Sequence, residues 1–202
     1  VSLLDDHAQM IAAALTLHEC GSGGDALDAA IFWAERVEDL FADRDHGGYF
    51  TTAQDAPGLI LRPRTAHDSA QPSGNATMLE NFARLFHLTG EARWHSRADA
   101  LVAAFSADMA GNPVPVTGLL NACHTLCRGA ALALPGATAG KDSESLSRAA
   151  WATSFPGLVR RPGDAAAADG VAVLCRGTVC GPPIRDPLEL AEQLREARRQ
   201  AS

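Results

Sequence analysis

Side chains that could move a proton or hold a ligand are concentrated at the starts of two predicted helices. Asp5 and Asp6 open the first helix, and His67, Asp68 and Asn75 stand at the start of the third. A carboxylate can act as a general acid or base, and an imidazole can transfer a proton or hydrogen-bond a hydroxyl group. Acid–base chemistry is therefore the first hypothesis, provided that the fold brings the two helix starts together.

Two arginines accompany these residues, and a simpler explanation exists for the whole set. Arg62 and Arg64 come just before the second group, and their guanidinium groups could hold an anionic or polyhydroxylated ligand. Acidic side chains are, however, favourable in the first turn of any helix, and Asn75 could form internal hydrogen bonds. Helix capping is therefore the alternative to a binding site at each of these positions.

Five cysteines raise the question of metal binding. Their odd number and the length of 202 residues favour reduced thiols. Cys123 and Cys127 are four residues apart on an apolar helical stripe, where cysteine is a normal core residue. Cys175 and Cys180 flank a predicted turn and could form a disulfide on oxidation. Zinc bound by these four thiolates is an alternative, but we expect no metal and, without a phosphate-binding glycine motif, no nucleotide cofactor.

Apolar residues at helical spacing predict five helices in the first 130 residues. The first is apolar on all sides and is therefore predicted to be buried, whereas the second has one apolar and one charged face. An alternation of buried and amphipathic helices is typical of stacked inner and outer layers in a helical toroid. The predicted helices cover residues 4–18, 25–41, 72–86, 94–109 and 116–127.

Shorter β-prone runs interrupt and follow the helices. Two runs within residues 48–62 flank a polar turn and predict a β-hairpin. Farther along, the runs AALAL and VAVLC, separated by a weak helical window at residues 142–152, predict strands with a crossover helix. We therefore expect a helical part at residues 1–130 and a small α/β part at residues 131–202.

The end of the chain predicts one well-capped helix. Asp186 can act as its N-cap, Pro187 suits the first helical position, and Glu189 completes a capping-box pattern. Leu188 and Leu194 then contribute to an apolar stripe beside a charged outer face. The α/β part is therefore predicted to end in a helix.

Composition restricts the partners. The 24 acidic and 17 basic residues give a net charge of −7, which repels the phosphate backbone of nucleic acids. The hydrophobic content of 47% is that of a globular protein, and neither a secretory signal nor an apolar run of roughly 20 residues, as a membrane span needs, is present. We expect a cytoplasmic protein that binds neither nucleic acid nor membrane. Because the chain opens at Val1 directly in a helical pattern, we also expect a fragment.

Several sequence blocks, taken in order, resemble a known family. The blocks are LLDDHAQMIAAAL, DHGGYF, RPRTAHDSAQPSGN followed by LFHLTGEARW, and AVLCRGTVCGPPIRDPLEL. Together they resemble the C-terminal third of the spermatogenesis-associated, thioredoxin-domain-containing protein family. The resemblance implies an (α/α)6 barrel, similar to N-acylglucosamine 2-epimerases and six-hairpin glycosidases, joined to an N-terminal thioredoxin-like domain. Since five helices cannot close such a barrel and no Cys-x-x-Cys motif occurs, we expect a partial toroid without the thioredoxin-like part.

The resemblance also implies a ligand. A sugar or amino sugar would bind at the mouth of the barrel, where helix starts meet, and a fragment could be inactive alone. Tyr49 in DHGGYF could then stack on a sugar ring, although an aromatic residue after a Gly-Gly break also packs readily in a core. A non-catalytic scaffold for a fused thioredoxin-like domain or a client protein is the alternative. For the sugar-binding function, catalytic roles are expected for Asp6, His67 and Asp68, and substrate contacts for Asp5, Tyr49, Arg62, Arg64 and Asn75.

Overall fold

The structure is mainly helical with one small mixed sheet, which confirms the predicted class. The computed structural model describes residues 2–21, 24–136, 141–177 and 179–201. The α-helices in these ranges are α1 (Leu4–Glu19), α2 (Asp25–Phe41), α3 (Gly74–Thr89), α4 (Ala92–Ala104), α5 (Ser106–Gly111), α6 (Thr117–Arg128), α7 (Lys141–Ala152) and α8 (Pro187–Ala201). The strands are β1 (Ala130–Leu134), β2 (Leu158–Pro162), β3 (Val173–Arg176) and β4 (Val179–Cys180), and short 3-10 turns lie at Val114–Val116 and Ala165–Ala167.

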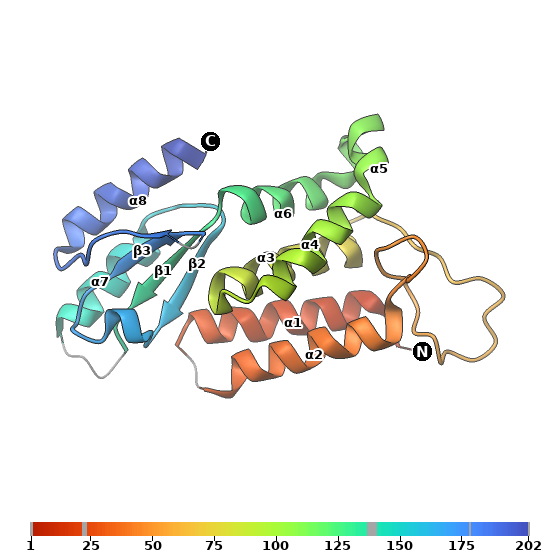
Figure 1. Ribbon diagram of the computed structural model, residues 1–202, viewed down its shortest axis with the longest axis horizontal. Coiled ribbons are helices and arrows are strands. Elements are labelled where there is room, and N and C mark those ends of the chain that lie inside the picture. The colour runs from red at the N-terminus through yellow and green to blue at the C-terminus, as the bar shows by residue number, and fades with distance from the viewer. Residues whose placement is uncertain (1, 22–23, 137–140, 178, 202) are drawn as a thin grey trace.

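The helices of the first part pack in two rows. Helix α3 lies between α1 and α6, and these three form one row (Figure 1). Helix α2 packs on α1, and α4 packs on α3 and α6, which gives the second row. Arg97 of α4 joins the two helices of that row through an ion pair with Glu35 of α2, with 2.7 Å between Nη2 and Oε2. Closure of such rows into a toroid remains a prediction.

Helix α3 is the central helix of this part. The Ser73 hydroxyl accepts a hydrogen bond from the Ala76 amide at its start, and Gly90, with φ of 71°, ends it in the left-handed conformation. Asn81 is fully buried in the middle of the helix and donates from Nδ2 to the Ala8 carbonyl oxygen at 2.8 Å. This bond fixes α3 against α1, because the buried Nδ2 group would otherwise lose its oxygen acceptor, while Oδ1 of the same side chain is buried without a hydrogen-bond partner.

Helix α1 is buried on one side only, so the prediction of a fully buried first helix is wrong. Leu4, Ile11 and Leu15 are buried, whereas Met10 and Leu17 are 45% and 53% exposed. In the described part of the chain, α1 packs against α2, α3 and β2. Apolar residues all around this helix therefore did not mean that other elements pack against every side of it.

The predicted helix over residues 94–109 is divided into α4 and α5. Phe105 lies between them with φ of −118° and ψ of 16°, outside the helical region. Its side chain is buried in the core beside the DHGGYF segment, and a Cβ atom at Gly48 would come within 2.8 Å of the Phe105 ring. Gly48 also has φ of 72°, so both its backbone and its surroundings require glycine.

The β-hairpin predicted for residues 48–62 is not formed, and this prediction is corrected. Tyr49 makes an isolated bridge with Ala42, and Thr52 makes one with Leu3, so neither pairs with the run near residue 60. The Thr52 carbonyl oxygen also accepts from the Arg62 guanidinium group. The Thr51 amide donates to the Pro63 carbonyl oxygen at 2.8 Å, but several other backbone groups of this segment bond to helix ends and side chains, so no regular two-stranded ladder forms.

The sheet has the order β2-β1-β3-β4. Strand β1 pairs in parallel with β2 and antiparallel with β3, which pairs antiparallel with β4. Helix α7 provides the crossover between the parallel strands and, with α8, contributes to the apolar cluster on one side of the sheet. The predicted strands AALAL and VAVLC, the helical window of α7 and the final helix are therefore confirmed. At the start of α8, the Leu188 amide donates to Asp186 Oδ1 at 2.9 Å, as capping requires.

Glu19, at the end of α1, ties the helices to the sheet. Its buried carboxylate accepts from Nε and Nη2 of Arg84 at 3.0 and 2.8 Å, and its second oxygen accepts from the Arg160 amide at 3.2 Å. Arg160 lies in β2, and the opposite edge of this strand is paired with β1. One carboxylate thus connects α1, α3 and the edge strand, although the predicted division into two parts remains untested.

Cys20, Cys123 and Cys127 are free thiols, as expected for all five cysteines, whereas Cys175 and Cys180 form the disulfide that was the alternative for this pair. The antiparallel register of β3 and β4 places Cys175 opposite Cys180 with 3.9 Å between Cα atoms, and the two form a disulfide. With this pairing, the four-thiolate zinc alternative would require the disulfide to be reduced first. Among the helices described here, none has the length and apolar character that crossing a membrane would require.

Candidate functional site

The starts of α1 and α3 border one small hollow of about 250 Å³. Asp5, His67 and Asn75 are all among its lining residues, together with Thr51 and Thr65. The fold therefore places three of the eight sequence-predicted site residues around the same space. What each side chain can offer a ligand depends on the contacts that it already makes.

Asn75 is committed to holding the DHGGYF segment. It is 1% exposed, its Oδ1 accepts from the Tyr49 amide, and its Nδ2 donates to the carbonyl oxygens of Tyr49 and Thr65, all at 2.9 Å. The Tyr49 side chain is 4% exposed, and its hydroxyl donates to Glu38 Oε2 at 2.8 Å. A ring at this depth cannot stack on a ligand, so core packing, the alternative for Tyr49, is what the structure contains.

Arg62 and Arg64 also fasten the chain to itself. The Arg62 guanidinium donates to the carbonyl oxygens of Leu40 and Thr52 and lies 4.3 Å from the centre of the Phe50 ring. Arg64 donates from Nη1 to the carbonyl oxygens of His46 and Gly47. Both guanidinium groups are therefore engaged, and their predicted contacts with a ligand would compete with these bonds.

Asp68 joins the starts of α3 and α6. Its Oδ1 accepts from the Ser73 amide at 2.9 Å, and its Oδ2 accepts from the Gly118 amide at 2.6 Å and the Thr117 hydroxyl at 3.2 Å. A Cβ atom at Gly118 would lie 2.8 Å from Asp68 Oδ1, so this close approach requires glycine. These contacts are those of a capping residue, which was the alternative to a catalytic role.

The two remaining residues predicted to be catalytic are at the surface. His67 has an exposed side chain whose Nε2 lies 3.9 Å from Asp108 Oδ1. Asp6 is exposed in the first turn of α1, and it is absent from the lining of the hollow that contains Asp5. Asp5 and His67 are thus the predicted residues with the most freedom to meet a ligand at this hollow.

A larger hollow of about 600 Å³ lies on the open face of the row α1, α3 and α6. Its polar lining comes from all three helices. Glu80 in the middle of α3 is the acidic residue of this lining. The other polar side chains around it are Gln9, Thr77, Asn121, His124 and Thr125.

Glu80 has the property expected of a proton donor. Burial raises the pKa of its carboxyl group, and a hydrogen bond with Thr125 and the charge of Arg84 offset only part of that rise. His124 Nε2 lies 3.2 Å from the carbonyl oxygen of Ala201 in α8. A neutral imidazole that donates there keeps Nδ1 as an acceptor. The hollow therefore combines a carboxyl group that holds its proton more tightly than a free glutamate with other hydrogen-bonding side chains.

Sequence reasoning missed Glu80 and His124 because each stands in the middle of a helix. A signal was nevertheless present, since Thr77, Glu80 and Arg84 place polar side chains at helical spacing on one side of the helix. His87, by contrast, was predicted to be structural, and it is buried with Nε2 3.0 Å from the Thr125 carbonyl oxygen. His87 thus differs from Glu80, because its ring lies against a backbone carbonyl oxygen whereas Glu80 lines a hollow.

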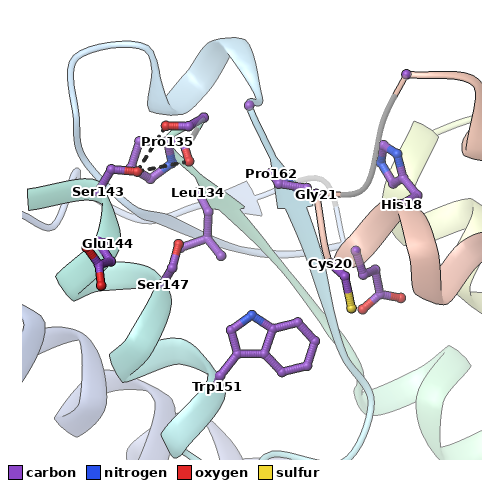
Figure 2. Close-up of a pocket in the computed structure, with 14 residues that line it drawn as sticks. His18, Cys20, Gly21, Leu134, Pro135, Ser143, Glu144, Ser147, Trp151 and Pro162 are labelled. Carbon is purple, nitrogen blue, oxygen red and sulfur yellow. Dashed lines mark hydrogen bonds between the residues drawn. The ribbon is translucent and has the colours of Figure 1, made fainter. Parts of the chain in front are cut away.

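A third hollow, of about 770 Å³, lies between the end of α1 and the sheet (Figure 2). His18 and Cys20 border it from α1, Leu134 and Pro162 from the carboxyl ends of β1 and β2, and Trp151 from α7. No sequence motif predicted this site. Within the described ranges, no group of three His, Cys, Asp or Glu side chains is arranged to hold a metal ion.

Comparison with known proteins finds relatives along almost the whole chain. It is 28% identical to spermatogenesis-associated protein 20 of Homo sapiens over 214 residues, which cover 95% of this chain and 27% of the human protein. The protein of the same name from Rattus norvegicus is 29% identical over 220 residues, and that from Mus musculus is 26% identical over 216. The chain thus spans about a quarter of the length of these relatives. No protein-family model matches it.

Proposed function

We propose that this chain contributes part of a carbohydrate-handling α/α toroid, with a sugar or amino sugar bound on the open face of the row α1, α3 and α6. The sugar class comes from the resemblance of the sequence blocks to a family with an epimerase-like barrel. The relatives found by comparison carry the family name of that resemblance. The observation that carries the proposal is Glu80, a carboxyl group with a raised pKa in a polar hollow.

The lining of this hollow suits a neutral polyol. Gln9, Thr77 and Asn121 supply donors and acceptors from three helices, so a ring with several hydroxyl groups would be held from three sides. A protonated Glu80 would donate a hydrogen bond to a ligand oxygen and could transfer that proton during reaction. The rigid α3, with its buried Asn81 bond to α1, keeps the carboxyl group in place.

Asp5 and His67 form the second polar set in this proposal. They border the small hollow at the helix starts, where an exposed imidazole and a carboxylate could hold a second sugar unit. Asp68, Asn75, Arg62 and Arg64 would then act as positioning residues, because their polar groups hold the chain around that hollow. Their direct contact with substrate remains a prediction.

Binding of hexoses tests the proposal. We expect a thermal-shift titration with neutral and N-acetylated hexoses to show a shift that weakens as the pH rises and Glu80 loses its proton. Glu80→Gln, which copies the protonated side chain, should bind without this pH dependence. Glu192→Gln, at an exposed position of α8, is the matched control and should behave as wild type. Absence of a shift for every sugar between pH 5 and pH 8 would refute the proposal.

A scaffold is the second candidate function, and it is favoured by exposed apolar side chains on α1. Met10 and Leu17 are 45% and 53% exposed, and their spacing of seven residues places them along one stripe of the helix. Such a stripe suits packing against another polypeptide, here a thioredoxin-like domain as in the resembled family. Met10→Lys should then abolish association with a separately expressed thioredoxin-like domain of a relative, as measured by analytical ultracentrifugation. Lack of association for the wild-type chain would exclude this function.

A further inference from the structure

The hollow between α1 and the sheet has an aromatic platform. Trp151, in the last turn of α7, is 50% exposed, and its indole ring faces the open space between α7 and the end of α1 (Figure 2). The guanidinium group of Arg160 lies 3.9 Å from the ring centre. Arg160 in turn donates to the Ala150 carbonyl oxygen at 3.1 Å. The indole ring is therefore held by a cation on one face, which leaves the rest of its surface for a ligand.

The position of this hollow is typical of ligand sites in α/β folds. Strands β1 and β2 are parallel, and their carboxyl ends at Leu134 and Pro162 border the space. Ligands in such folds bind outside the carboxyl ends of the parallel strands. The Ser143 hydroxyl donates to the carbonyl oxygens of Pro135 and Gly136, which fixes the chain after β1 to α7. This part of the border is thus anchored by hydrogen bonds.

The charges around the hollow favour a neutral ligand. Glu19 is neutralised by Arg84, and Glu144 lies 2.6 Å from Arg148 Nη2. Burial lowers the pKa of His18, so its imidazole is neutral near pH 7. Among the lining residues described, no lysine or arginine is present to hold a phosphate group. The remaining polar groups, such as the Ser147 hydroxyl, suit uncharged donors and acceptors.

We propose that this hollow binds an uncharged planar heteroaromatic molecule with hydroxyl groups, of the nucleoside class, stacked on Trp151. The base would lie on the indole ring, and its polar edge and the ribose hydroxyls would meet Ser147 and His18. The volume of about 770 Å³ is within the range of small-molecule sites. This site is separate from the Glu80 hollow, so either one can exist without the other.

Calorimetric titration with adenosine and with adenosine monophosphate is the first test. We expect saturable adenosine binding, and weaker binding of the monophosphate because the lining carries two carboxylates, whereas the neighbouring Arg160 guanidinium is already engaged by Trp151 and the Ala150 carbonyl oxygen. Trp151→Ala should weaken adenosine binding at least about fivefold, since stacking of a base on an aromatic ring is worth about 1–3 kcal/mol. Phe32→Ala removes an aromatic side chain with 57% exposure on α2 and should bind as wild type.

Protection of Cys20 provides a second readout in the wild-type chain, independent of variant folding. Cys20 and Cys127 are both exposed thiols, but only Cys20 lines this hollow. Adenosine should slow alkylation of Cys20 by iodoacetamide and leave the rate at Cys127 unchanged. Absence of saturable adenosine binding, an unchanged rate at Cys20, or tighter binding of the monophosphate would each overturn the inference.

Discussion

Replacement of Asn75 by alanine should cost about 3 kcal/mol of stability. The change removes three hydrogen bonds and leaves the amide and carbonyl groups of Tyr49 without partners in a buried position. A buried polar group that loses its partner costs about 1–3 kcal/mol, so two such groups account for the total. The third partner, Thr65, is exposed, and water can replace that bond. The loss is a large part of the roughly 5–15 kcal/mol that stabilises a typical domain.

Urea unfolding followed by circular dichroism and tryptophan fluorescence measures this loss of free energy. In a separate thermal unfolding experiment, the melting temperature should fall by roughly 6–12 °C, since 1 kcal/mol corresponds to about 2–4 °C in a chain of this size. Asn121→Ala is the matched control because Asn121 is exposed on α6, and it should change the free energy of unfolding by less than about 0.5 kcal/mol. An Asn75→Ala variant within about 0.5 kcal/mol of wild type would show that water satisfies the Tyr49 groups instead.

Three further predictions follow from other parts of the structure. Since the raised pKa makes folded Glu80 hold its proton more tightly than the unfolded chain does, stability should fall as pH rises above the ordinary carboxyl value of about 4.3. Thermal unfolding should therefore show Glu80→Gln gaining stability over wild type toward pH 7 and losing that gain near pH 4; a constant difference would contradict this. Gly48→Ala should destabilise the chain by about 1–3 kcal/mol more than Gly58→Ala, because both glycines have positive φ but only Gly48 has a ring within 2.8 Å of its Cβ position. Equal losses of unfolding free energy for the two variants in urea would refute the expected clash with the Phe105 ring. Mass spectrometry of the native chain after alkylation should show Cys20 and Cys127 modified first and Cys123 later, because burial raises the pKa of the Cys123 thiol. Cys175 and Cys180 should react only after reduction.

The sequence was sufficient for most helices because their signals are local. Apolar spacing located α1, α2, α3 and α6, and the Asp186 cap located α8. The strands AALAL and VAVLC were likewise recognisable as short apolar runs between turns. These features depend on residues within a few positions of one another, where pattern and propensity are informative.

The candidate site was harder to predict because its contacts join distant parts of the chain. Asn75 bonds Tyr49 across 26 positions, and Arg62 bonds Leu40 across 22. No local sequence pattern distinguishes side chains that form such internal hydrogen bonds from ligand-binding side chains of the same chemical type. Glu80 presents the opposite case, since its significance comes from burial and from a space that α1, α3 and α6 create together.

The contact between Glu19 and the Arg160 amide also bears on how this chain behaves beside its copies. Strand β2 is an edge strand, and an edge amide without a partner is a template for pairing with a strand from another molecule. The buried Glu19 carboxylate accepts a hydrogen bond from the Arg160 amide on this edge. Strand β4, at the opposite edge of the sheet, is two residues long. The end of α1 thus removes one free donor from the β2 edge, which leaves fewer backbone groups for pairing with a strand of another molecule.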